Sequence, residues 1–172
     1  MDQDLARYIN DHLAGSSGAL LLIQKLADSH DAPEAKEFFL DLKEDIEADQ
    51  SLLEELLERI EQSPSALLKL AGGIAARISG IKLRWEQIEP GKLGLFEALE
   101  MLALGVHGKH LLWVALSEIA VWIPEWSDND FAKLDLQAIQ QRDTIEFWRI
   151  QAARDTLAGA ERRIGKAPDA HK

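Results

Sequence analysis

Imidazole and carboxylate side chains recur beside the apolar stripes of four predicted helices, at similar distances along the chain from two predicted turns near His30 and Pro124. Helices joined at such turns would bring these groups to about the same height, because each residue advances a helix by ~1.5 Å. A layer of this kind in an apolar bundle can bind divalent metal ions or move protons. The candidate site residues are His12, Asp49, Glu100, His107, Asp143 and Glu146.

Helical phase selects Asp49 from the many acidic residues of the second helix. Asp49 lies close to the stripe that contains Ile46, whereas Glu47 points away from that stripe. His12 lies beside Ile9 on the inner face of the first helix. These two helices are therefore expected to contribute one carboxylate and one imidazole to the interior.

The other two helices supply the remaining candidates. Glu100 and His107 are seven residues apart, which places them two turns apart on one helix face. Asp143 and Glu146 are predicted to face the core of the last helix. The buried stripe of that helix is expected to consist of Leu136, Ile139, Ile150, Ala153, Leu157, Ala160 and Ile164.

Four long helices and a crossover are expected to position these groups. Apolar residues recur at three- and four-residue spacing, and clusters of Pro, Gly, Ser and Asp separate the periodic segments. The segment 93–119 is apolar nearly all round, which is typical of a helix surrounded by other helices. The expected elements are helices at 4–28, about 33–61, 93–119 and from 131 to about 165, a weak helix at 66–87 within a crossover at about 64–90, a turn at 121–130 and a frayed tail at 166–172.

The fold is predicted to be all-α, since no stretch alternates with a period of two for long enough to form a strand. The 172 residues are expected to form one helical-bundle domain. Two hairpins joined by a long crossover resemble the ferritin-like superfamily in topology. The segments NDHLAG (10–15) and ALEMLALGVHGK (98–109) also resemble a group of poorly characterised bacterial ferritin-like proteins. The resemblance implies a four-helix bundle with an additional crossover helix and, in active members, a two-metal carboxylate site.

The metal motif of that superfamily is absent from this chain. Ferritin-like sites use Glu-x-x-His on two of their helices, but none of the five histidines has Glu three residues before it. The candidate site is therefore degenerate, and iron or another divalent metal as its cofactor is implied by the resemblance alone. The residues that precede the five histidines by three are Ile9, Ala27, Leu104, His107 and Pro168.

A metal-free interpretation explains the same pattern. Buried ionisable groups are stable when they pair with one another, and Lys109, Arg142 and Arg149 are available as partners. Two functions are thus expected from different classes. One is a ferritin-like protein that binds divalent metal in the bundle core, and the other is a metal-free helical interaction or dimerisation module with a buried polar network. Neither pattern identifies a reaction.

Composition excludes several further classes. The formal net charge of −11 is the wrong sign for a protein that neutralises phosphates, so no nucleic acid partner is expected. Cysteine is absent, which excludes disulfides and thiolate metal ligands. The chain lacks a signal-like start and an apolar stretch of about 18 residues, so a cytoplasmic protein with no membrane partner is expected.

Two further groups of residues carry structural expectations. Gly105 and Gly108 lie inside a predicted helix, where they would permit tight packing against Trp148 or the crossover. Aromatic residues gather near the second turn, where they could form an exposed apolar cap for a homodimer or a local mini-core under the loop. The tryptophans of this group are Trp113, Trp122 and Trp126.

Overall fold

A computed structural model describes residues 3–60 and 88–158, and within them the chain is helical with short connections. The four long helices are nearly equal in length, at 27 or 28 residues each. A short 3-10 helix lies between the last two. In chain order the elements are α1 (Gln3–Ser29), α2 (Pro33–Ile60), α4 (Leu93–Ala120), η2 (Pro124–Trp126) and α5 (Phe131–Leu157).

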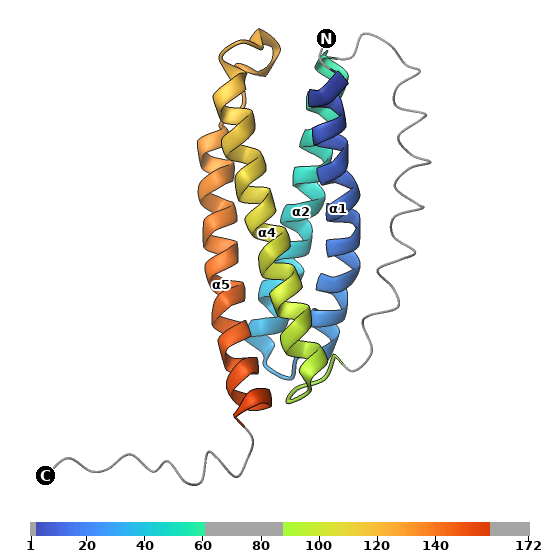
Figure 1. Cartoon of the computed structure of the whole chain (residues 1–172), viewed down its shortest axis with the longest axis vertical. Helices are drawn as coiled ribbons and strands as arrows, with labels where there is room; N and C mark the ends of the chain where they lie inside the picture. Colours follow the sequence, from blue (N-terminus) through green and yellow to red (C-terminus); the bar gives the residue numbers. More distant parts are fainter. Residues whose placement is uncertain (1–2, 61–87, 159–172) are drawn as a thin grey trace, which may run out of the picture.

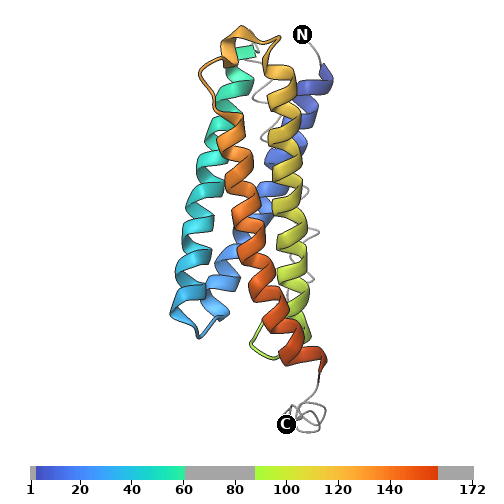
Figure 2. The ribbon, with the colours of Figure 1, turned by 90° about the vertical axis from the view of Figure 1, so that its left-hand side faces the viewer.

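The four helices form an elongated bundle of two antiparallel hairpins (Figures 1 and 2). α1 packs against α2 and α4 packs against α5, and the two hairpins meet mainly where α1 faces α4. α2 ends at the same end of the bundle as α4 does, so these two helices run parallel (Figure 1). They lie diagonally across the bundle from one another, as α1 and α5 do (Figures 1 and 2). For the described residues, the predicted all-α fold with paired helices is confirmed.

Two apolar clusters fill the interior at different heights. The first contains Phe39 and Leu99 and is centred on the end where α1 turns into α2. The second contains Trp113 and Trp126 and lies toward the η2 end. Both clusters draw on both hairpins, so burial of apolar surface stabilises their docking.

The helix boundaries agree with the turn residues of the sequence. Pro33 opens α2, because a proline tolerates the first helical turn where its missing N–H has no partner to lose. Asp130 caps α5, since its side chain accepts a hydrogen bond from the backbone N–H of Lys133 at 3.0 Å. Gly91 precedes α4 with φ of +77°, a conformation that side chains disfavour.

The predicted buried stripe of α5 is wrong in phase. Leu136 and Leu157 are each 55% exposed, although both were expected to be buried. The buried residues instead recur every seven positions, with the polar Gln141 as an additional buried residue. The small Ala138 and Ala152 therefore face the core in place of the larger leucines. Small residues allow α4 and α5 to approach closely along their length. The buried residues of α5 are Phe131, Ala138, Gln141, Ile145 and Ala152.

Several predicted features lie outside the described residues. They are the crossover helix at 66–87, the last part of the final predicted helix with Ala160 and Ile164, and the frayed tail at 166–172. None of the helices in the described part of the chain has the length and apolar character that a membrane-spanning helix needs.

Candidate functional site

A buried ion pair crosses the bundle between the diagonally opposed helices α2 and α4. Lys109 Nζ donates to Asp49 Oδ2 at 2.6 Å. The two side chains are 11% and 9% exposed, respectively. Asp49 lies in the stripe of α2 that also buries Ile46 and Leu53, and Lys109 lies in the stripe of α4 between Val106 and Leu112. The predicted burial of Asp49 is confirmed.

Burial and charge act on Asp49 in opposite directions. Removal of the carboxylate from water raises the pKa of Asp49, and this effect outweighs the neighbouring Lys109 ammonium, which lowers it. Asp45, one turn away on α2, raises the pKa further. The ionised carboxylate is therefore held in the bundle at a net cost to folding.

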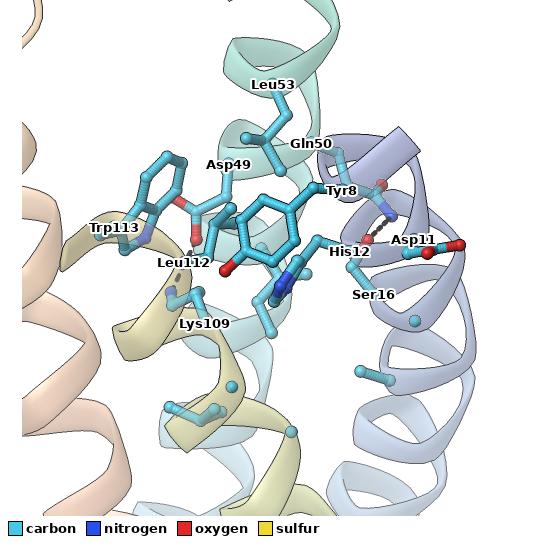
Figure 3. A pocket seen from close by; sticks show the side chains of 16 residues that line it. Tyr8, Asp11, His12, Ser16, Asp49, Gln50, Leu53, Lys109, Leu112 and Trp113 are labelled. Atoms are coloured by element: carbon cyan, nitrogen blue, oxygen red, sulfur yellow. Dashed lines mark hydrogen bonds and ion pairs between the residues drawn. The ribbon is translucent and has the colours of Figure 1, made fainter. Parts of the chain in front are cut away.

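The ion pair forms part of the wall of a cavity of about 480 Å³ between α1, α2 and α4 (Figure 3). Apolar side chains and the indole of Trp113 make most of the wall. Tyr8, Asp11, Gly15 and Gly105 are exposed and mark the mouth of the cavity between α1 and α4. The apolar and aromatic residues that line it are Tyr8, Ala19, Ile46, Leu53, Val106, Leu112 and Trp113.

Few polar groups share the cavity with the ion pair. Gln50 Nε2 donates to Ser16 Oγ at 2.7 Å and links α2 to α1. The His12 ring packs edge-on against Tyr8, with ring centroids 4.8 Å apart. Burial lowers the pKa of His12, and Asp11 opposes this only in part, so the imidazole is neutral at pH 7. In Figure 3, Tyr8 and His12 lie on the α1 side, across the cavity from Lys109.

Glycines keep the cavity open. Gly15, Gly105 and Gly108 line it, and a Cβ atom built at any of the three would meet no atom of residues 3–60 and 88–158 within 4 Å. The expected tight packing of Gly105 and Gly108 against Trp148 is therefore not found, and the alternative, packing against the crossover, lies outside the described residues. Their missing side chains leave space next to Lys109 instead.

The six candidate residues divide between two places. His12 and Asp49 line the cavity. The other four line an open groove between α4 and α5 on a different face of α4. In residues 3–60 and 88–158, no three His, Asp or Glu side chains gather closely enough to hold a metal ion. The four in the groove are Glu100, His107, Asp143 and Glu146.

The carboxylates in that groove are paired with arginines at the surface. Arg149 bonds Glu146 at 2.6 Å and Glu100 at 3.1 Å. Arg142 bonds Asp143, the next residue, at 2.9 Å. The prediction that Asp143 and Glu146 face the core is wrong, because the buried stripe of α5 runs through positions 138, 141 and 145 instead.

The histidines of α4 also lie outside the cavity. His107 is exposed and stacks on His110, with ring centroids 5.4 Å apart. His110 Nδ1 is hydrogen-bonded to Asp135 of α5. This contact joins two packed helices, and it gives His110 a structural partner without bringing it toward His12 or Asp49.

The tryptophans near the second turn have different environments. Trp113 and Trp126 are fully buried, and Trp126 Nε1 donates to the Leu56 carbonyl at 3.2 Å. Trp122 is 77% exposed beside Val121. Trp113 and Trp126 pack with Phe131 as a mini-core, so only Trp122 of the three is available for an exposed cap.

Lys109 lies in the buried ion pair, although the sequence pattern indicated it only as a possible counter-ion. Its position three residues from Val106 and from Leu112 places it on the buried stripe of α4, while the nearby His107 falls outside that stripe. The uniform hydrophobicity of α4 concealed this phase. The spacing of Lys109 from Leu102 and Leu116, seven residues on either side, is the signal that would have found it.

Comparisons of the chain with protein-family models, with curated proteins and with solved structures found no significant match.

Proposed function

We propose that this protein binds a small organic molecule in the cavity between α1, α2 and α4. The observation that carries the proposal is the Asp49–Lys109 ion pair in the wall of an otherwise mainly apolar cavity of about 480 Å³. Ligand sites in proteins are typically apolar hollows of this size range with a few convergent polar groups. The proposed role is binding, and no reaction is assigned to it.

The cavity wall combines features that do not favour folding. Burial raises the pKa of Asp49 in spite of Lys109, so a contribution to folding stability does not explain why the charged pair is present. Glycine in a helix interior is about 1 kcal/mol less favourable than alanine, yet two line the cavity on α4 with no neighbour among the described residues that requires their small size. Protein interiors are otherwise closely packed. A bound molecule would account for both features at once.

The geometry favours an organic molecule over a metal ion. Only one carboxylate and one imidazole, from Asp49 and His12, belong to the buried part of the wall. The Lys109 ammonium already occupies a position 2.6 Å from that carboxylate and would repel a second cation. Divalent metals are typically held by several carboxylate or imidazole side chains, and the described part of the chain has no cluster of three such groups.

Ferritin-like architecture remains part of the proposal. Parallel α2 and α4, each in its own antiparallel hairpin, support the connectivity of a bundle with one long crossover. In such bundles, sites are built in the core from side chains on facing helices. We infer that the Asp49–Lys109 pair stands in the region where active ferritin-like bundles hold metal.

Native mass spectrometry of the purified full chain tests the proposal. We expect an adduct of small mass that organic solvent extracts, together with binding of an apolar fluorescent probe such as anilinonaphthalene sulfonate. Gly108→Phe should abolish both by filling the cavity. Leu111→Phe is the matched control, because Leu111 is 51% exposed on α4 and does not line the cavity.

Circular dichroism would confirm that both variants are folded. Absence of any adduct and of probe binding in the wild type would overturn the proposal. Equal loss of binding in the Leu111→Phe control would show that the probe does not report on the cavity. Stoichiometric metal in protein purified without chelator would instead favour the metal-binding alternative.

A further inference from the structure

The buried part of the cavity wall has no net charge. Asp49 contributes one negative charge and Lys109 one positive charge, and they contact each other directly. Gln50 and Ser16 are uncharged and bonded to each other. The lowered pKa of His12 leaves its imidazole neutral at pH 7. The charged Asp11 lies at the exposed mouth, where Arg7 approaches it at 4.0 Å.

Hydrogen-bonding capacity nevertheless remains on this wall. Lys109 has three N–H donors and uses one on Asp49 among the described residues. Asp49 Oδ1 accepts no hydrogen bond from the described part of the chain. The fully buried Trp113 Nε1 also lacks a hydrogen-bond partner there. A ligand with one polar group could therefore find both donors and an acceptor close together.

On the basis of the proposed function, we infer that the ligand is an uncharged, mainly apolar molecule that carries a hydroxyl or carbonyl group facing the Asp49–Lys109 pair. Ile46, Leu53, Val106 and Leu112 would contact its apolar body.

A charged ligand would meet opposition from one member of the pair. A carboxylate that approached Lys109 would also approach Asp49, whose oxygen is only 2.6 Å from the ammonium. An ammonium that approached Asp49 would meet Lys109 in the same way. Either ligand would give up its hydration without gaining an unopposed counter-charge, and such desolvation is strongly unfavourable. A hydroxyl or carbonyl group gives up far less hydration on entry.

Three probes with the same tail and different head groups test this inference. Octanol, octanoate and octylammonium would be titrated into the full-length wild type at neutral pH, with tryptophan fluorescence and isothermal calorimetry as readouts. We expect octanol to bind at least about tenfold more tightly than either ion, since a factor of ten corresponds to only a fraction of the desolvation penalty. Gly108→Phe should abolish octanol binding.

Each result bears on a different claim. Tighter binding of octanoate or octylammonium would overturn the inference about charge and leave the proposed small-molecule site standing. No binding of any of the three probes would overturn the proposed function itself. Binding that persists in Gly108→Phe would also count against it, because the probe would then lie outside the cavity.

Charge variants provide an independent second test. Asp49→Asn leaves Lys109 unbalanced and should shift the preference by about tenfold or more toward octanoate. Lys109→Met leaves Asp49 unbalanced and should shift it toward octylammonium. Circular dichroism would identify the variants that fold. The comparison of the three probes in the wild type tests the inference even if neither variant folds. Unchanged preferences in folded variants would show that the pair does not face the ligand, and would overturn the inference.

Discussion

Replacement of Lys109 by methionine should reveal how strongly the bundle is destabilised when the buried Asp49 carboxylate loses its counter-ion. Methionine keeps most of the length and apolar volume of lysine but removes the ammonium that lies 2.6 Å from Asp49 Oδ2. Coulomb's law gives about 6 kcal/mol of attraction at 2.6 Å and an effective dielectric constant of about 20. Removal of the lysine also relieves its own desolvation, so the net loss is smaller. We expect Lys109→Met to lower the free energy of unfolding by about 3–5 kcal/mol at neutral pH.

The same change should make stability depend more strongly on pH. Without Lys109, burial and Asp45 act on the Asp49 carboxylate unopposed, and both raise its pKa. A carboxyl group whose folded pKa is raised stabilises the fold below its unfolded pKa and loses that contribution as pH rises through the folded value. The deficit of Lys109→Met should therefore shrink on acidification, when the buried carboxylate is neutralised.

The assay is urea unfolding followed by far-ultraviolet circular dichroism. The double variant Asp49→Leu with Lys109→Met buries no charge and should regain most of the loss or exceed the wild type by about 1–4 kcal/mol. Arg142→Met is the matched control. It removes the partner of Asp143, whose side chain is 65% exposed, and should change stability by less than about 1 kcal/mol. Equal small effects of Lys109→Met and Arg142→Met would refute the claim that the Asp49–Lys109 pair is desolvated.

Three further predictions use other parts of the bundle. Gly108→Ala should raise the free energy of unfolding by about 0.5–1 kcal/mol, because its Cβ meets no neighbour among the described residues. Gly91→Ala should lower the free energy of unfolding by about 1 kcal/mol, because φ is +77° there. Urea midpoints that shift in the same direction for the two variants would contradict this. The free energy of unfolding of the wild type minus that of Asp49→Asn should fall as pH rises from below 3.8 through the raised folded pKa of Asp49, because the buried carboxyl group then ionises. A difference that rises with pH would mean that the attraction of Lys109 outweighs burial. Trp122→Ser should reduce any self-association seen by light scattering, since Trp122 is 77% exposed. Leu157→Ser, at the other end of the bundle, should not reduce it. Identical masses for wild type and Trp122→Ser would argue against a contact between copies at the Trp122 end.

Helix positions could be predicted from the sequence because the signals are local. The apolar spacing of α1 and α2 and the breaks at Pro33 and Pro124 mark where helices begin and end. The burial of Asp49 followed from the same spacing, since its neighbours Ile46 and Leu53 define a single clear stripe. A strongly amphipathic helix leaves little choice of inner face.

The inner faces of α4 and α5 could not be assigned in this way. α4 is apolar nearly all round, so hydrophobicity alone does not distinguish the buried Lys109 from the exposed His107. α5 buries Ala138, Gln141 and Ile145 and exposes Leu136, so its inner face does not follow the most hydrophobic side chains. Packing between helices decided these faces, and that information is not local in the chain. The shift of phase on α5 moved Asp143 and Glu146 from the predicted core site to the surface.

The cavity is a property of two hairpins together. α1 and α2 supply His12, Gln50 and Asp49, while Lys109 and Gly108 come from α4 in the other hairpin. Each hairpin contains contacts that are close in sequence and can form rapidly, but the wall is complete only after the hairpins dock. A molecule that occupies the cavity therefore acts as a non-covalent clamp between the halves of the chain. A rise in its concentration would raise the free energy needed to separate the halves, so occupancy would couple to the stability of the whole chain.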